Sequence, residues 1–121
     1  MPLTARILIG LVAFLHVGFL VLEMFLWNKP LGRRVFGLER DFADRSRTLA
    51  ANQGLYNGFL AAGLAWSLFP VGAPSADLAI ATFFLACVTI AGLYGAATAS
   101  GMILFVQAVP AIIALVVLWM F

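Results

Sequence analysis

Four apolar segments, each long enough to cross a lipid bilayer as a helix, make up most of the chain. They cover approximately residues 7–27, 48–69, 78–98 and 102–121. At about 1.5 Å of rise per residue, about 20 residues match the roughly 30 Å of hydrocarbon in a bilayer. A helix satisfies its own backbone hydrogen bonds in lipid, and these segments lack the regular alternation of a barrel strand. The sequence therefore predicts an all-α transmembrane protein.

The composition indicates the same class. Of the 121 residues, 64% are hydrophobic and 10% are charged, and the mean hydropathy is +1.10. Both values lie far outside the range of soluble proteins. The first apolar run follows Arg6. It is longer than the roughly 7–15 residues of a signal-peptide core, and no small-x-small cleavage site follows it, so we expect it to remain as the first transmembrane helix.

The short connections favour a bundle whose helices alternate in direction. The stretches "PVGAPSAD" and "ASG" are long enough to join only antiparallel neighbours. Pro70 is expected to end the second helix. We therefore predict one membrane domain over residues 1–121, an up-down-up-down four-helix bundle with a polar loop at approximately 28–47.

The positive charges predict the orientation of this bundle. Six of the seven Lys and Arg residues lie in the loop at 28–47, while Arg6 lies on the opposite side. The positive-inside rule places the loop in the cytoplasm and both termini outside, in a bacterial inner membrane. The same cluster explains the net charge of +2, so no nucleic-acid partner is predicted. The loop is either a segment lying on anionic headgroups or a solvated linker.

Polar side chains gather in the half of the predicted bundle nearest the charged loop. Counted from the helix ends at 1.5 Å per residue, Glu23 lies about 6 Å deep and His16 about 16 Å deep. The same count places Asn52 about 6 Å and Asn57 about 14 Å deep. The opposite half is nearly bare of polar groups, so we expect a polar pocket near the cytoplasmic leaflet with an apolar floor. All four helices supply its candidate ligand-binding residues: His16, Glu23, Asn52, Gln53, Tyr56, Asn57, Tyr94 and Gln107.

Local spacing supports a shared interior. His16 and Glu23 are seven residues apart and therefore lie on one face of the first helix. The Gly54-x-x-x-Gly58 spacing lets a neighbouring helix approach closely. Pro110 lacks a backbone donor, so we expect an irregularity in the last helix beside Gln107.

The chain resembles a family of small bacterial integral membrane proteins that carries only a domain-of-unknown-function label. The resemblance lies in "HVGFLVLEMFLW", "GRRVFGL" and "LAANQGLYNGFLAAGL", and in the pattern of Tyr94, Gly95, Gln107, Pro110 and Ala111. It covers essentially the whole chain and implies a four-helix membrane protein. The family brings no reaction, cofactor or site residue, so function must be argued from the side chains.

Metal and cofactor chemistry is not predicted. His16 and Glu23 lie about 10.5 Å apart along one helix, too far to hold one ion through bonds of about 2 Å. The other helices offer only amide and phenol groups, so we predict no metal and no cofactor. Cys87 is the single cysteine, which excludes an intramolecular disulfide, and we expect it to be a small buried apolar residue.

Three interpretations of the polar residues remain open. The functional one that we favour is the binding or transport of a small amphipathic molecule, with transport requiring a homo-oligomer. The second is a membrane-embedded acid–base enzyme, isomerase-like, that acts on a lipophilic substrate with His16 and Glu23 as candidate catalytic groups. The third is a purely structural polar network in an interaction or scaffold protein, since amides and phenols commonly join helices in membranes. Glu23 argues against the third, because an intramembrane carboxyl group usually marks a functional site. The alternative is that Glu23 lies near the headgroups and pairs with Arg33 or Arg34.

Overall fold

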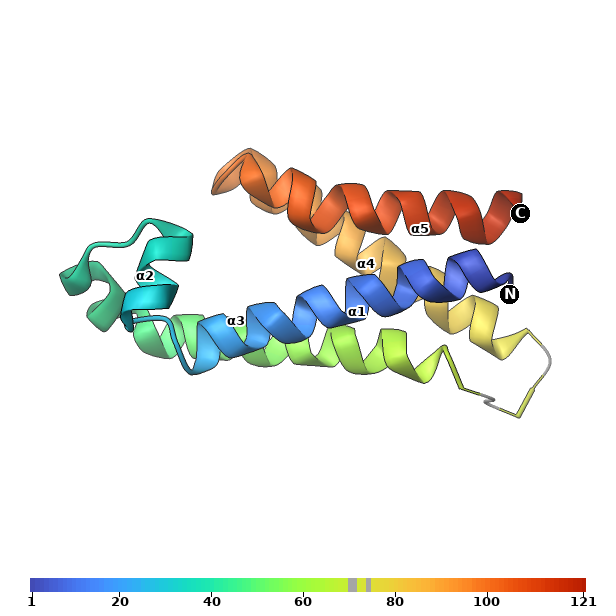
Figure 1. The fold of residues 1–121 in the computed structure, drawn as a ribbon, viewed down its shortest axis with the longest axis horizontal. Coiled ribbons are helices and arrows are strands. Elements are labelled where there is room, and N and C mark those ends of the chain that lie inside the picture. The colour runs from blue at the N-terminus through green and yellow to red at the C-terminus, as the bar shows by residue number, and fades with distance from the viewer. Residues whose placement is uncertain (70–71, 74) are drawn as a thin grey trace. The chain divides into compact units, whose positions relative to one another are not determined.

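The computed structural model of the chain contains helices joined by turns, with no strand, in the part that it describes, which is residues 1–121 without 70, 71 and 74. In order, the elements are α1 (Leu3–Met24), α2 (Pro30–Phe36), α3 (Arg40–Trp66), α4 (Ala76–Thr98), the π-helical turn η1 (Leu104–Ala108) and α5 (Val109–Met120) (Figure 1). The predicted all-α class is confirmed. Pro70, which we expected to end the second helix, lies outside the described residues, and the helix itself ends at Trp66.

Two of these helices are long and apolar enough to cross a membrane. They are α1, with 22 residues, and α4, with 23 residues. At 1.5 Å per residue, each is about 33 Å long or slightly longer, close to the hydrocarbon thickness of a bilayer. A shorter apolar helical stretch covers Leu104–Met120.

The observed helix ends differ from the ends of the apolar segments. The first helix ends at Met24, although its apolar segment continues to Trp27, and α3 begins at Arg40 within the expected loop. The first turns of α3 are charged and carry an ion pair between Asp41 and Arg45, with 3.0 Å between oxygen and nitrogen. Such a pair supports a helix in water, and Asp41 complements the helix dipole. Hydropathy therefore located the apolar part of this helix and missed its charged beginning.

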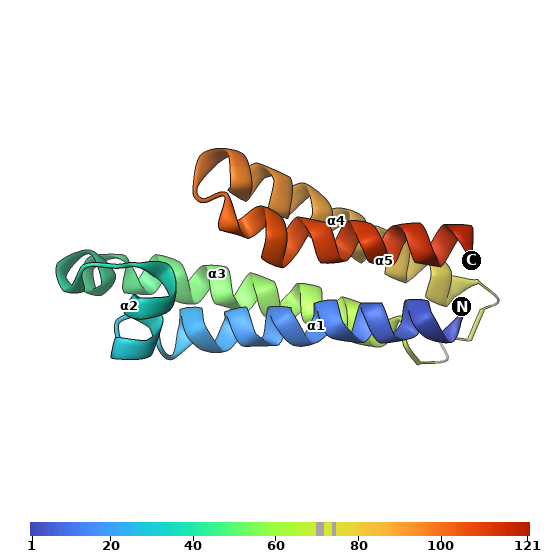
Figure 2. The same cartoon turned by 45° about the horizontal axis from the view of Figure 1, so that its top comes forward.

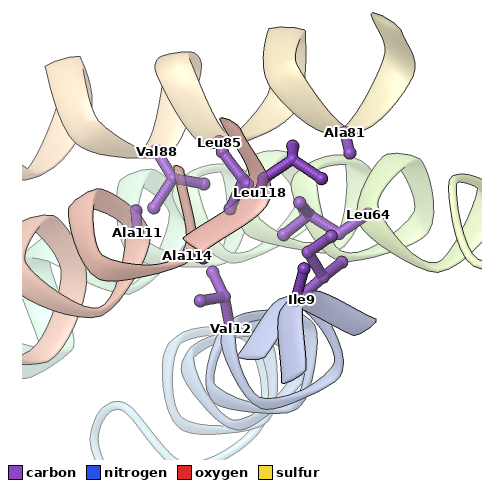
Figure 3. Close-up of a cluster of buried hydrophobic side chains, with 10 residues drawn as sticks. Ile9, Val12, Leu64, Ala81, Leu85, Val88, Ala111, Ala114 and Leu118 are labelled. Carbon is purple, nitrogen blue, oxygen red and sulfur yellow. The ribbon is translucent and has the colours of Figure 1, made fainter. Parts of the chain in front are cut away.

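The chain divides into two compact units, residues 1–15 with 60–121 and residues 16–59. The first unit is built around one apolar core to which α1, α3, α4 and α5 all contribute (Figure 3). Small residues among the larger ones let the helices approach closely. The buried members of this core are Ala5, Ile9, Val12, Leu64, Ala81, Leu85, Val88, Ala111, Ala114 and Leu118.

Polar contacts in the first unit tie its helices together around this core. Trp119 donates a hydrogen bond from its indole nitrogen to the Thr82 hydroxyl at 3.0 Å, which links α5 to α4. Near the start of α1, the Arg6 guanidinium donates to the carbonyl oxygen of Leu68 at 2.6 Å. That carbonyl follows the end of α3, where backbone acceptors have no partner within the helix.

The irregularity expected near Pro110 is a π-helical turn. The backbone N–H of Val109 donates to the carbonyl oxygen of Leu104, five residues earlier. This turn lies against α4, and α4 and α5 lie side by side in both views (Figures 1 and 2). The contact is close, because a Cβ added to Gly92 would lie 2.6 Å from the backbone nitrogen of Ala108.

In the second unit, α2 packs against the chain that follows α1 (Figure 2). Pro30 stands at the start of α2 and Gly37 ends it with φ +65°, which are the positions that these two residues favour. A side chain at Gly32 would collide with the carbonyl oxygen of Leu26. The rings of Trp27 and Phe36 pack with their centroids 5.0 Å apart. Part of the expected loop is therefore an ordered helix.

Candidate functional site

A polar pair joins α1 to α3 within the second unit. Asn57 donates a hydrogen bond from its side-chain nitrogen to Oε1 of Glu23 at 2.5 Å. The Asn57 side chain is buried, with 6% of its surface exposed, and Glu23 is half-buried. Both residues come from the predicted set, and the structure brings them into direct contact.

Two glycines allow the close approach of helices that this pair requires. A Cβ at Gly54 would lie 2.7 Å from Cγ of Met24, and one at Gly58 would lie 2.6 Å from Cδ1 of Leu20. Side chains larger than hydrogen would push the helices apart at both positions. The Gly-x-x-x-Gly pattern therefore serves packing inside this unit.

His16 is fully buried on α1, two turns before Glu23. Its ring contacts Phe19 edge-on, with 5.1 Å between the ring centroids, and the residue makes a further polar or electrostatic interaction. An imidazole so placed is held by its surroundings in a fixed position. Its participation in ligand binding or catalysis stays a prediction.

Three predicted residues lie on an exposed face of α3. Asn52, Gln53 and Tyr56 are all exposed. Asn52 donates a hydrogen bond from its side-chain nitrogen to the Tyr56 hydroxyl at 3.2 Å, one helical turn away. The Tyr56 ring also packs at a tilt on Phe59, with 6.1 Å between ring centroids. Amide and phenol groups are therefore exposed on this face, and the membership of these three residues in a ligand site stays a prediction.

The remaining two predicted residues, Tyr94 and Gln107, belong to the first unit. Tyr94 lies near the end of α4 with 72% of its surface exposed. Gln107 lies within the π-helical turn η1, is half-buried and makes a polar or electrostatic interaction. Their membership in one site with Glu23 and Asn57 stays a prediction.

Within the described part of the chain, no group of three or more His, Cys, Asp and Glu side chains could hold a metal ion. Cys87 is half-buried on α4. The chemistry that the observed pair offers is hydrogen bonding: a carboxyl group held by an amide, with acceptor capacity on both carboxyl oxygens.

A hollow of about 340 Å³ lies in the second unit and was not predicted. It is formed where α1 ends, the chain turns toward α2, and α3 passes through its third turn. The residues that line it are Met24, Phe25, Trp27, Asn28, Lys29, Arg47, Thr48 and Ala51. The sequence signal was the Lys and Arg cluster, from which we predicted the orientation of the protein and either a segment lying on anionic headgroups or a solvated linker, but no hollow.

The chain is similar to one family and one curated protein. Residues 10–119 match the family described as "Protein of unknown function (DUF1304)". The chain is 34% identical over 118 residues to the uncharacterized protein YpaA of Lactococcus lactis subsp. lactis strain IL1403, covering 96% of this chain and 97% of that protein. No solved structure matches the chain significantly. The chain therefore belongs to the DUF1304 family of proteins of unknown function, as its resemblance to a domain-of-unknown-function family predicted.

Proposed function

We propose that this protein is a multi-pass inner-membrane protein that binds a small amphipathic molecule beside Glu23 and Asn57. The observation that carries the proposal is the hydrogen bond between these two side chains, one on each of two neighbouring apolar helical stretches. The termini lie outside the cell and the charged loop lies in the cytoplasm, as the charge distribution favours.

The exposed surface of α1 supports the membrane part of the proposal. Its exposed large side chains recur every three or four residues, so they form one apolar face along the whole helix. An apolar face of this length is unfavourable in water and well suited to lipid. The side chains of this face are Leu3, Ile7, Leu11, Phe14, Val17 and Val21, and the exposed Phe25 follows directly after the helix.

The carboxyl group of Glu23 supports the binding part. A carboxyl group within a membrane-spanning helix is unfavourable and usually marks a functional site, while an amide or hydroxyl would link two helices at lower cost. Asn57 engages Oε1, and a carboxyl has about four acceptor sites in all. The pair can therefore accept hydrogen bonds from a hydroxyl or amine of a ligand whose apolar part remains in the bilayer.

The exposed amides of α3 add to this argument. Asn52 and Gln53 would meet hydrocarbon if no partner covered them, because residues 48–66 contain no charged side chain and form an apolar stretch. Polar side chains in lipid are normally satisfied by another helix or by a ligand. A bound amphipathic molecule or a second copy of the chain would supply that partner.

A structural role is the second candidate, and the same hydrogen bond favours it. The pair stands directly beside the Gly54 contact, so it could act as a link between α1 and α3 with no ligand. An acid–base enzyme that uses His16 and Glu23 stays a prediction from the sequence.

Native mass spectrometry of the gently purified protein separates these candidates. We expect a discrete small molecule to accompany the wild type and to be lost from Glu23→Gln and Asn57→Ala. The control is Thr98→Ala, which removes an exposed hydroxyl that bonds only to the carbonyl oxygen of Tyr94 in its own helix. Bare wild-type protein, with both site variants less stable than Thr98→Ala, would contradict binding and support the structural role. The same spectra give the number of copies in the assembly.

A further inference from the structure

We propose that the hollow between the end of α1 and the charged beginning of α3 is a phosphate-binding site. It is distinct from the Glu23–Asn57 pair and lies wholly within the unit of residues 16–59. A volume of about 340 Å³ falls at the lower end of the range of small-molecule pockets, roughly 300–1,000 Å³. This volume is ample for a phosphate with a small organic substituent.

The charge of the lining argues for an anion. Lys29 and Arg47 are the charged residues among those that line the hollow, and the lining includes no carboxylate. The two cations approach from different parts of the chain, one following α1 and one on α3. Thr48 adds a hydroxyl that can donate a hydrogen bond, and the Asn28 amide, which gives one N–H to Asp44, has a second N–H to donate. Proteins commonly bind phosphate groups through such donors: arginine, lysine, amide and hydroxyl side chains.

Hydrogen bonds between the residues that follow α1 and the first turns of α3 hold this part of the chain in place around the hollow. Trp27 donates from its indole nitrogen to the Ser46 hydroxyl at 3.0 Å, and Ser46 donates to the carbonyl oxygen of Phe42 at 2.7 Å. Asn28 donates to Oδ1 of Asp44 at 3.1 Å. These bonds hold residues 27 and 28 against α3 before any ligand arrives, and such preorganisation favours binding.

Part of the lining of the hollow is apolar, which suits a phosphate that carries a hydrocarbon substituent. Met24, Phe25 and Ala51 line the hollow together with the polar groups. Tryptophan beside lysine or arginine is typical of the level of the lipid headgroups. A phospholipid headgroup and a free phosphate share the chemistry that this site would recognise. The lipid alternative rests on the membrane location in the proposed function, whereas recognition of phosphate rests on the hollow alone.

Trp27 provides a local probe because it lines the hollow. The chain has three tryptophans, so Trp66→Phe with Trp119→Phe leaves Trp27 as the single emitter. This reporter, purified in phosphate-free dodecyl maltoside, is titrated at constant ionic strength with sodium phosphate and, separately, with dihexanoylphosphatidylglycerol. We expect a saturable change in Trp27 emission with at least one of the two probes.

Two double variants with the same charge change test where the probe binds. Lys29→Gln with Arg47→Gln removes both cations of the hollow, and we expect binding to weaken by about tenfold or more, because each charge-assisted hydrogen bond contributes about that factor. Arg34→Gln with Arg40→Gln removes two exposed cations that do not line the hollow, and we expect unchanged binding. Lys29→Arg with Arg47→Lys keeps both charges and should retain binding. This variant shows whether changes at these two positions weaken binding through loss of charge or through misfolding.

The outcomes distinguish both the source of the phosphate and the proposal itself. A lipid that binds about tenfold more tightly than sodium phosphate assigns the hollow to a headgroup, since apolar contacts add about that much. Equal binding assigns it to free phosphate. The absence of any saturable change with either probe, or equal weakening in the two double-glutamine variants, overturns the proposal. Neither result bears on the molecule that accompanies Glu23 and Asn57, so the two sites can fail separately.

Discussion

Asn57 and Glu23 are hydrogen-bonded side chain to side chain, although 34 residues separate them in the sequence. This contact joins α1 to α3 where glycines bring the two helices close together. An amide is a suitable partner for a carboxyl group in an apolar helix, because it donates a hydrogen bond without adding a charge. Substitutions of Glu23 and Asn57 can therefore separate a structural role of this contact from a role in ligand binding.

Asn57→Ala should lower the free energy of unfolding by about 0.6–1.7 kcal/mol, the range measured for hydrogen bonds between helices in membranes. The loss arises because the Glu23 carboxyl group would keep its position without its donor. Unfolding of the protein in mixed micelles, followed by circular dichroism at increasing sodium dodecyl sulfate, measures this difference.

Asn52→Ala is the matched control for this substitution. Asn52 is exposed, and its hydrogen bond goes to Tyr56 of the same helix, so its loss should cost no more than about 0.5 kcal/mol. Glu23→Gln should also be tolerated, since a glutamine side-chain oxygen can accept the bond from Asn57. Equal losses in Asn57→Ala and Asn52→Ala would show that the contact with Glu23 contributes nothing to stability.

Gly92→Ala should destabilise the first unit by about 1–3 kcal/mol, the usual cost of overpacking a close contact. The added methyl group would meet the backbone nitrogen of Ala108 at 2.6 Å, and a backbone atom cannot rotate away as a side chain can. Gly18→Ala, on exposed α1 surface with no atom within 4 Å of the added carbon, should be neutral or slightly stabilising because alanine favours helix. The same unfolding assay compares them, and similar values for both would contradict the close packing of η1 on α4.

The proposed orientation can be tested by cysteine labelling. In a Cys87→Ala background, the cysteine of an Arg34→Cys variant should react with a membrane-impermeant maleimide in inverted vesicles and not in intact spheroplasts. The cysteine of an Ala73→Cys variant, in the short loop before α4, should show the opposite pattern. Both positions are exposed, so accessibility of the side chain is not limiting. If both cysteines react in the same preparation, positions 34 and 73 lie on the same side of the membrane, and the proposed single crossing between them is wrong.

The fold was predictable where hydropathy and helix geometry agree. The apolar lengths of α1 and α4 are enough to mark them as helices, because few other structures bury such runs. The helix α2 was missed, although Pro30 at its start and Gly37 at its end are the ordinary signals of a short helix. Those signals lie in a charged stretch. We interpreted that stretch by its charge, which indicates topology, and therefore did not predict a helix there.

The contact between Glu23 and Asn57 was predictable only in part. Both residues were placed on the inner faces of neighbouring helices, but depth counting put Glu23 level with Asn52. Asn52 lies about 7.5 Å from Asn57 along the helix at 1.5 Å per residue. The count started from the ends of the apolar segments, whereas α1 ends at Met24 and α3 begins at Arg40. Register between two helices depends on their packing contacts, here at Gly54 and Gly58, and hydropathy contains no information on those.

Ser46→Ala should loosen the segment that follows α1, at Trp27. The Ser46 hydroxyl accepts the indole hydrogen bond of Trp27 at 3.0 Å and donates to the carbonyl oxygen of Phe42 at 2.7 Å. Its removal leaves the half-buried indole without this acceptor, which should cost about 1 kcal/mol of stability. Ser46→Thr retains the hydroxyl group and is the matched control. In the protein whose remaining tryptophan is Trp27, we expect fluorescence anisotropy to fall in Ser46→Ala and to hold in Ser46→Thr. Unchanged anisotropy in both variants would mean that packing against Phe36, at 5.0 Å between ring centroids, is enough to fix the indole and that the walls of the hollow do not depend on Ser46.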